Sequence, residues 1–508
     1  MINRTKSPAN PLLEPLGNFH EMPDWPGILK CNPLDTFPDS PSAEQRDEYL
    51  DYATKQFAPT RTSLLVANEI QTMLRAGYRE RNPCNPENQR KIYEIAKLKD
   101  DFDVKSSTFY SSARCLIVAG ITNMGKSSMI ARSVSHYPQI AVHGRRNDAH
   151  WLKHTQVTHL TVKMPADGSR GGLLLAILHS LDVAVYSDYL NTLGRKRQAV
   201  EKLTLEVAKL LALHSVGLII LEEMQAKNFK DSKFKDHLQL FFLGVLSFGI
   251  PLVLVGNPRA FEGLGEFKQT ESRFFSVEPI TLWPYHDHTD PDWLKAIAPA
   301  IWGYQVVPNA QPFDEGVAKT LWECSGGMPG YARRLVIEVQ KSILRRSCDR
   351  LDVDSISDHF ERLASFRKFK PLIDGLIHYD NRKLVAAGAE DIPVDAFVEH
   401  WRAHGLTPTS DDPPKEPSTD KVEASQGDWN EEKERRLRAE KTHKTKKRRK
   451  ARKDAELRES TDPDDLRHRD TVKQNLTKGL KQLEKAAEEK KKQDNAKRNK
   501  KKTTRRNK

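Results

Sequence analysis

Residues 120–127 decide the fold of this 508-residue chain, and they read Gly120-Ile-Thr-Asn-Met-Gly-Lys-Ser127. The stretch matches the pattern G-x-x-x-x-G-K-[ST], with an apolar strand predicted before it and a helix predicted after it. Glycines in such a loop let backbone N–H groups curl around a phosphate, and the start of the helix adds its dipole. The candidate phosphate-binding residues are Gly120, Thr122, Asn123, Met124, Gly125, Lys126, Ser127 and Ser128.

Two side chains of this loop are expected to act on the nucleotide directly. Lys126 would neutralise the β and γ phosphate oxygens of ATP, and the Ser127 hydroxyl would ligate Mg²⁺. The loop therefore predicts that the chain binds a nucleoside triphosphate, with ATP and Mg²⁺ as its cofactors.

A second motif, Leu218-Ile-Ile-Leu-Glu-Glu223, places two carboxylates after four apolar residues, as in a Walker B segment. Glu222 would hold Mg²⁺, and Glu223 would orient and deprotonate the attacking water. Since aspartate is usual at the first position, the longer side chain of Glu222 predicts slow hydrolysis. The alternative, two exposed glutamates that end a strand, stays open.

Three further positions are candidates for sensing the nucleotide. Asn257 follows a buried strand and would read the γ-phosphate and the water, although Gly-Asn after a strand is also an ordinary turn. Arg273 would reach the γ-phosphate of a neighbouring subunit, or else make a surface ion pair. Arg333 and Arg334, farther along the chain, are candidates for a second sensor, and the sequence does not decide between them.

Short apolar runs alternate with helical segments around these motifs, which predicts an α/β fold with a mostly parallel sheet covered on both faces. The predicted strands are Arg114–Ala119, Val157–Val162, Gly217–Leu221, Leu252–Val255 and Val277–Leu282. The predicted helices are Gly125–His136, Leu173–Tyr186, Lys196–His214 and Lys233–Phe248.

Composition divides the chain into five predicted regions. Residues 1–60 hold nine of the 29 prolines and predict an extended arm, with a short helix that opens at a capping box at Ser42. Residues 61–113 predict a helical extension, either a brace on the core or a docking surface. The remaining regions are an ATPase core at 114–290, a helical lid-like region at 291–406, and a linker with a basic disordered tail at 407–508.

The formal net charge of +13 belongs entirely to this tail. Residues 401–508 carry 34 basic and 21 acidic side chains, whereas residues 1–400 carry 48 of each, which excludes a uniformly basic, histone-like protein. The tail predicts non-specific DNA affinity or the docking of a partner, and nuclear import is the less favoured reading of its basic runs.

Other features predict a cytoplasmic protein without a membrane span. The longest apolar stretch, Leu240–Gly256, contains Gly249 and Pro251, and the N-terminus lacks a signal-peptide pattern. The five cysteines lie far apart, with no C-x-x-C and no ligand-like histidine spacing, which argues against a disulfide framework and against a zinc site.

The order of these motifs is that of the AAA+ class, and within it the chain resembles the TnsC/TniB transposition regulators of bacterial cut-and-paste transposons. The resemblance runs from about residue 62 to 334. It rests on Arg75-Ala-Gly-Tyr-Arg-Glu-Arg-Asn-Pro83, Tyr137-Pro-Gln139, Leu221-Glu-Glu-Met-Gln225, and Gly249-Ile-Pro251 before a strand that ends Gly256-Asn-Pro258. The departures are Glu222 in place of aspartate, and Asn257 at a variable sensor position.

This resemblance implies an ATPase that forms a ring or helical filament on duplex DNA and disassembles on hydrolysis. Its implied partners are DNA, a target-selector protein, transposase subunits and further copies of itself. By match to the family, Lys163 is a candidate DNA-phosphate contact, and the basic turn Arg195-Lys196-Arg197 is a second one. Such contacts need only positive charge, and a solvated surface cation is the alternative at each position.

Two other functions remain open. A helicase loader of the AAA+ class would also bind ATP and DNA. A STAND-type signalling NTPase has a Gly-x-Pro element like Gly327-Met-Pro329, but such proteins append repeat arrays, and no repeat is visible here.

Overall fold

The computed structural model describes residues 9–97, 113–194, 199–262, 264, 272–309, 311–346, 350–387 and 392–409. The chain divides into two units, residues 1–414 and 415–508, and all of the described residues belong to the first. The predicted tail beyond residue 409 and the predicted basic turn at 195–197 lie outside the described residues.

A five-stranded parallel sheet forms the centre of this unit, in the order β4-β5-β6-β1-β7. Its strands are β1 (Cys115–Gly120), β4 (Leu160–Lys163), β5 (Ile219–Met224), β6 (Leu252–Gly256) and β7 (Ile280–Leu282). Every predicted strand is present with somewhat shifted ends, so the predicted parallel sheet of the AAA+ type is confirmed.

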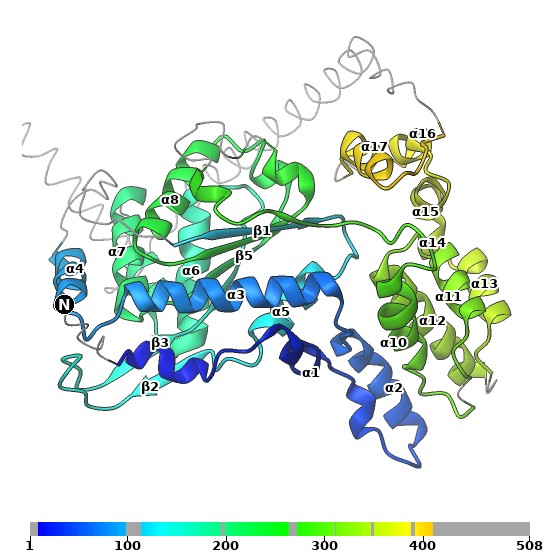
Figure 1. The fold of residues 1–508 in the computed structure, drawn as a ribbon, viewed down its shortest axis with the longest axis horizontal. Helices are drawn as coiled ribbons and strands as arrows, with labels where there is room; N and C mark the ends of the chain where they lie inside the picture. Colours follow the sequence, from blue (N-terminus) through cyan, green and yellow to red (C-terminus); the bar gives the residue numbers. More distant parts are fainter. Residues whose placement is uncertain are drawn as a thin grey trace, which may run out of the picture. The chain divides into compact units, whose positions relative to one another are not determined.

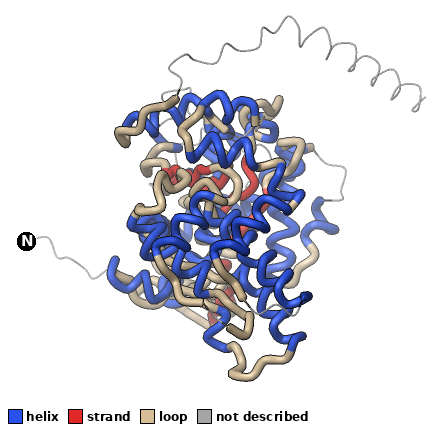
Figure 2. The backbone as a smooth tube through the Cα atoms, turned by 90° about the vertical axis from the view of Figure 1, so that its right-hand side faces the viewer, coloured by secondary structure: helices blue, strands red, loops and turns tan. Residues whose placement is uncertain are grey.

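Both faces of the sheet are buried, because successive side chains of each strand enter opposite cores. Leu116 and Val118 of β1 pack in the core that includes α3 and α5, whereas Cys115 and Ile117 pack in the core formed with α6, α7 and α8. Figures 1 and 2 show the strands between these helices. The helices are α3 (Arg61–Glu80), α5 (Lys126–Val134), α6 (Arg170–Val185), α7 (Val200–Leu213) and α8 (Lys235–Ser247).

Helix α4 (Pro86–Lys97) lies within the predicted helical extension at 61–113. An antiparallel hairpin of β2 (Ile140–His143) and β3 (His154–Val157) was not predicted. The strands of the hairpin are four residues long and carry polar side chains such as His154 and Gln156. Their sequence therefore lacks the continuous apolar run by which the central strands were recognised.

Helices follow the sheet throughout the predicted lid-like region. They are η8 (Trp293–Ile297), α10 (Ala298–Gly303), α11 (Glu315–Glu323), α12 (Pro329–Arg346), α13 (Val353–Arg362), α14 (Ala364–Arg367), α15 (Lys370–Ile377), α16 (Asn381–Ala386) and α17 (Val394–Ala403). Large side chains such as Trp302, Phe366 and Trp401 are buried in the core that also includes α3 and α5. Within the described chain, no helix combines the length and the apolarity that a membrane span needs.

The proline-rich segment differs from the extended arm that was predicted, because it packs on the core. It forms η1 (Pro11–Leu16), η2 (Met22–Asp24), α1 (Trp25–Leu29), η3 (Pro33–Thr36), α2 (Ala43–Tyr52) and η4 (Ala53–Lys55). Leu12 and Leu16 enter the main core, and Trp25 is buried against α3. The predicted capping box at Ser42 opens α2, with Gln45 as its partner.

Two arginines, one on α3 and one on α5, hold this segment by its carbonyl groups. Arg75 on α3 donates to the carbonyl oxygens of residues 16–18 at 2.6 to 3.1 Å. Arg132 on α5 donates to those of residues 28–30 at 2.9 to 3.2 Å. These charge-assisted hydrogen bonds satisfy backbone acceptors at the ends of the short helices η1 and α1.

Helix α2 attaches the same segment to the helical region. Leu50 and Ala53 pack in a small core with Tyr304 and Val306. The Tyr304 hydroxyl donates to the Tyr49 carbonyl oxygen at 2.6 Å. The N-terminal segment therefore contacts both the ATPase core and the helical region, and it links the two.

His136, just after α5, lies under the N-terminal segment. Its ring is 5.2 Å from that of Trp25 and 5.4 Å from that of His20, and both ring nitrogens are buried with no hydrogen-bond partner among the described residues. Burial, with smaller contributions from the neighbouring His20 and Arg132, lowers the pKa of His136 to about 4. Burial also lowers the pKa of His154 and of His159 to about 4.

These shifts predict a loss of stability in mild acid. Between the unfolded pKa of about 6.5 and the folded value the unfolded chain binds more protons, so the free energy of unfolding falls as the pH drops through this window. Urea unfolding at pH 7.5 and pH 5 should show that His136→Phe reduces the loss by about 1–2 kcal/mol. The same change at the exposed His179 should leave the loss of stability between pH 7.5 and pH 5 unaltered. If both variants lose equal stability between these pH values, the assignment to His136 is wrong.

Candidate functional site

The loop between β1 and α5 turns sharply through two residues with left-handed backbone conformations. Gly125 has a φ of 84° and Asn123 a φ of 70°, both in the left-handed region. Asparagine tolerates this region better than most residues do, and glycine enters it without strain. The glycine at position 125 thus turns the chain directly into α5.

The start of α5 is open to an anion. Gly125 is its N-cap and provides no side-chain acceptor, so the first N–H groups of the helix have no side-chain cap. The ammonium of Lys126 lies against the loop and donates to the carbonyl oxygens of Gly120 at 2.7 Å and Ile121 at 2.8 Å. Ser127 is exposed in the first turn. Uncapped donors, a cation and a hydroxyl suit a polyphosphate with its metal ion.

The other predicted residues lie at the same edge of the sheet, because the carboxyl ends of parallel strands meet there. Strand β6 lies between β5 and β1, and its Gly256 pairs with Met224 on one side and with Ala119 on the other. Asn257 therefore follows β6 between the Walker B carboxylates and the start of the phosphate loop. Adjacent strands are about 4.8 Å apart, so the three groups are neighbours.

A bulge at the end of β5 turns Glu223 away from the strand. The pairing with β6 shifts between Leu221 and Met224, and Glu223 has a φ of 61°. Glu223 is exposed, whereas Glu222 is half-buried. A left-handed non-glycine residue costs about 1–3 kcal/mol and is most frequent at functional sites, where such bulges re-aim side chains.

Asn228, which the sequence reasoning missed, supports this bulge. Its side-chain amide donates to the Glu223 carbonyl oxygen at 2.9 Å, and its side-chain oxygen accepts from the Gln225 N–H at 2.8 Å. Asn228 is only 5% exposed, so both bonds are shielded from water. The signal in the sequence is the three-residue spacing of Gln225 and Asn228, which forms a capping box at η6 (Ala226–Asn228).

Asn257 is 6% exposed and fixed through its backbone. Its N–H donates to the Met224 carbonyl oxygen at 2.9 Å, and it is the N-cap of η7 (Pro258–Phe261). Its place at the sheet edge suits a sensor of the γ-phosphate, and the role remains a prediction.

Lys163 lies at the same edge of the sheet as Glu222, whereas Arg273 lies outside the strands. Lys163 is exposed at the end of β4 and is the register partner of Glu222. Arg273 is half-buried in the helical stretch 272–274, anchored by the fully buried Phe274. Their roles toward DNA and toward a neighbouring subunit stay predictions, as do those of Arg195, Lys196 and Arg197 outside the described residues.

The helical region contacts the phosphate loop through the start of α12. The Gly330 N–H donates to the Asn123 carbonyl oxygen at 2.9 Å. A Cβ at Gly330 would lie 2.8 Å from both the Cβ and the carbonyl oxygen of Asn123, so only glycine fits there. The preceding turn is held by Gly327, whose φ is 71° and whose carbonyl oxygen accepts from the Tyr285 N–H at 3.1 Å.

Arg333 and Arg334 differ in their surroundings, although both lie within one turn of Gly330. Arg334 is exposed and its guanidinium lies over the Phe366 ring at 5.7 Å. Arg333 is half-buried, its Nε has no hydrogen-bond partner among the described residues, and burial lowers its pKa. A buried cation without a hydrogen bond at Nε is suited to an incoming anion, so Arg333 is the better candidate for the second sensor.

The contact at Gly330 gives a direct test of the helical region's part in nucleotide binding. We expect Gly330→Ala to push α12 off the loop and to weaken the binding of a fluorescent ATP analogue by about tenfold, since one lost contact of this kind is worth about 1.4 kcal/mol. Gly303→Ala is the matched control, because a Cβ there meets nothing within 4 Å. Equal affinities for the two variants would show that the contact does not support binding.

Two of the stretches that carry the predicted family resemblance contact each other. A Cβ at Gly77 would lie 3.0 Å from both the Gly249 carbonyl oxygen and the Pro251 ring, so α3 approaches the start of β6 closely. The Pro138 carbonyl oxygen accepts from the Thr158 hydroxyl at 2.6 Å. These motifs therefore have structural roles, since they hold α3 and the loop after α5 against the sheet.

Comparison with known proteins gives a family for the central part of the chain. The model of the family described as bacterial TniB protein matches residues 95–285. No curated protein matches the chain. The sequence-based resemblance is thus confirmed over the matched residues.

Two solved structures are similar to the chain, each with a TM-score of 0.32. Cdc6p from Pyrobaculum aerophilum has 13% identity, with 64% of this chain and 88% of that chain covered. The Drosophila origin recognition complex (ORC) bound to DNA has 10% identity, with coverages of 80% and 91%.

Proposed function

Because residues 95–285 match the TniB family, we propose that this protein is an ATP-dependent regulator of DNA transposition. It assembles on target duplex DNA when ATP is bound, and it couples a target-selector protein to the transposase. The assembly dissociates when ATP is hydrolysed. The phosphate loop at the start of α5 is the observation that carries this proposal.

The loop supplies the nucleotide-binding half of the function. The uncapped first turn of α5 and the ammonium of Lys126 offer N–H groups and a positive charge to the phosphates. Ser127 and Glu222 would hold Mg²⁺, which when bound screens the charge between the β and γ phosphates. The side chains present fit this group, since a hydroxyl and a carboxylate are hard oxygen ligands.

The residues at the sheet edge supply the hydrolytic half. Glu223, exposed on its bulge, accepts the proton of the attacking water, and Asn257 holds that water in position. Arg273 stabilises the developing charge from across a subunit interface, and Arg333 senses the phosphates from α12. The bound nucleotide therefore controls whether the protein is assembled on DNA or disassembled.

DNA binding in this proposal depends on a few cations, because residues 1–400 carry no net charge. Lys163 and the turn at 195–197 would contact backbone phosphates, so binding tolerates any sequence and weakens with salt. The basic tail adds affinity for DNA or for the transposase.

Filter binding and electron microscopy of the full chain test the proposal. With a non-hydrolysable ATP analogue, the protein should bind two unrelated duplexes with similar affinity and form regular assemblies on them, and with ADP it should do neither. If the protein does not bind DNA in the presence of the analogue, the proposal is wrong. Capture of a helicase instead of a transposase by the assembled protein would favour a helicase loader.

A further inference from the structure

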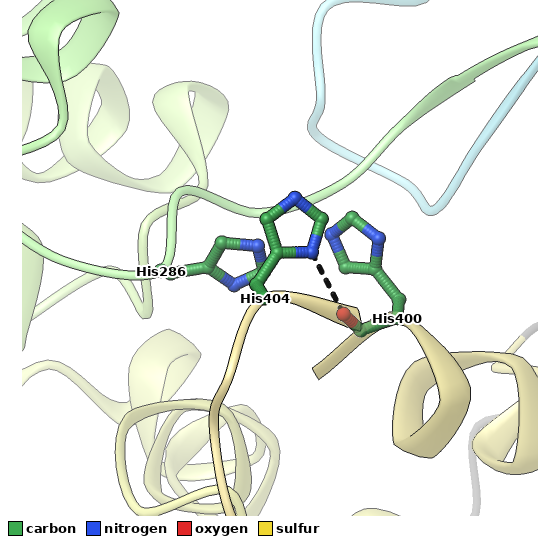
Figure 3. A group of neighbouring side chains, drawn as sticks. All are labelled: His286, His400 and His404. Atoms are coloured by element: carbon green, nitrogen blue, oxygen red, sulfur yellow. Dashed lines mark hydrogen bonds between the residues drawn. The ribbon is translucent and has the colours of Figure 1, made fainter. Parts of the chain in front are cut away.

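Three histidines that the proposed function does not use converge at the end of the helical region. His286 follows β7, in the segment that joins the sheet to the helices, whereas His400 lies on α17 and His404 is the C-cap of that helix. One nitrogen from each ring lies within 4.8 Å of those from the other two (Figure 3). The ring centroids are 4.3 to 4.8 Å apart.

Hydrogen bonding leaves nitrogens free to act as ligands. The Nδ1 of His404 lies 2.8 Å from the His400 carbonyl oxygen (Figure 3). A carbonyl only accepts, so Nδ1 carries the proton and Nε2 keeps its lone pair. The Nε2 of His400 is buried and has no hydrogen-bond partner within the described residues. A buried imidazole nitrogen without a partner is costly unless a ligand satisfies it.

The surroundings hold the rings in place. Trp283 stacks on His400 with centroids 4.3 Å apart and an angle of 15°, and the Tyr379 hydroxyl donates to the His286 carbonyl oxygen at 2.9 Å. Gly405, with a φ of 73°, ends the helix just after His404. Among the three rings, His404 also donates its Nδ1–H to a backbone carbonyl, which is the contact that typically orients a ligating histidine.

Burial favours the neutral form of two of the rings, His400 and His286, and neutral imidazole is the form that binds metals. Burial, with smaller contributions from the neighbouring His286 and His404, lowers the pKa of His400 to about 3. Burial and His404 also lower the pKa of His286, whereas Asp290 raises it.

We propose that His286, His400 and His404 bind a divalent transition metal ion, with Zn²⁺ as the best fit. Three imidazoles are typical of borderline-soft ions, whereas Mg²⁺ and Ca²⁺ prefer oxygen. Zn–N bonds of about 2.0–2.1 Å place tetrahedral ligands roughly 3.4 Å apart, so nitrogens that lie within 4.8 Å of one another need to draw together by up to about 1.4 Å. Small rotations of the three side chains would supply this movement.

A metal ion here fixes the end of α17 to the segment between the sheet and the helical region. His286 follows Tyr285, whose N–H donates to Gly327 in the turn before α12. That turn leads into the contact of Gly330 with the phosphate loop. The site therefore stabilises the position of the helical region relative to the sheet and takes no part in ATP hydrolysis.

Titration of metal into the full chain tests the proposal without nucleotide, since ATP would itself bind the metal. The protein carries no histidine tag and is first freed of metal with a chelator. Isothermal titration with ZnCl₂ should give one site per chain, and excess Mg²⁺ should not displace the ion. Co²⁺ should produce the visible absorption of a tetrahedral nitrogen site, and the melting temperature should rise with bound Zn²⁺.

Single variants assign the site to these residues. His400→Asn and His286→Asn should each lower Zn²⁺ affinity by at least about tenfold and remove the Co²⁺ spectrum. His378→Ala changes an exposed histidine just after α15 and should leave both unchanged. Circular dichroism shows whether each variant folds. If a variant does not fold, the Co²⁺ spectrum of the wild type still tests the proposal. No stoichiometric Zn²⁺ binding by the wild type, or unaltered binding by both asparagine variants, would overturn the proposal and leave the three rings as an aromatic packing cluster.

Discussion

Lys126→Ala should abolish ATP-dependent assembly on DNA and weaken ATP binding by about 100-fold. The ammonium lies inside the phosphate loop, 2.7 Å from the Gly120 carbonyl oxygen, where it is held in place for the phosphates. A hydrogen bond to a charged group is worth about 1.5–3 kcal/mol, which is a factor of about 10 to 150 in affinity. Alanine removes the charge and all three donors without disturbing the loop glycines.

Binding of a fluorescent ATP analogue, followed by filter binding to duplex DNA, measures this effect. Lys153→Ala is the control for nucleotide binding, because Lys153 is exposed before β3 and away from the loop. If the Lys126 variant binds ATP within threefold of the wild type, the assignment of the loop is wrong. If it binds ATP normally but fails to assemble, the loop acts on DNA by another route.

Glu223→Gln should separate binding from hydrolysis. Glutamine keeps the size of the side chain and the left-handed backbone at this position, whose φ is 61°, but it cannot accept the proton of the attacking water. General bases contribute about 10²–10⁴-fold, so phosphate release should fall by at least about a hundredfold. ATP affinity and assembly on DNA should persist, and the assemblies should outlive those of the wild type.

Phosphate release and the lifetime of the DNA complexes are measured side by side. Glu201→Gln is the control, since Glu201 is an exposed glutamate on α7 that pairs with Arg170. Unchanged phosphate release from the Glu223 variant would exclude this glutamate as the base. A wild type without any hydrolysis would mean that the chain acts only as an ATP-bound clamp.

Local pattern predicted the sheet well because its strands are buried on both faces. The run Cys115–Gly120 is apolar at every position up to the glycine, and its loop carries the glycine and lysine spacing that only phosphate binding requires. Glu222, Glu223 and Asn257 were found in the same way, as polar residues that directly follow apolar strands. Their meeting at one edge follows from parallel pairing alone.

The packing of the proline-rich segment on the core could not be predicted from such local patterns. Prolines predict chain without regular hydrogen bonds, but Arg75 and Arg132 supply the missing donors from helices more than 50 residues away. The closeness of Gly77 to Pro251 is equally invisible along the chain. Asn228 was missed because its two hydrogen bonds act on a bulge that only strand pairing creates.

The histidine cluster shows the same limit for sites. His400 and His404 are four residues apart, a spacing that places both on one side of a helix and that the search for metal ligands overlooked. The third member, His286, comes from a segment 114 residues earlier. The three rings come together only because α17 packs on that segment.

The sequence by itself determined the class of the fold and predicted a nucleotide site, because strand burial and phosphate binding impose short patterns with few alternatives. The tertiary structure alone decided three things: that residues 9–60 pack on the core, that Arg333 is half-buried while Arg334 is exposed, and that three histidines meet. Each of these depends on contacts between residues far apart in the chain. Such contacts are set by the sum of many weak packing and hydrogen-bond terms, and no local pattern of residues records that sum.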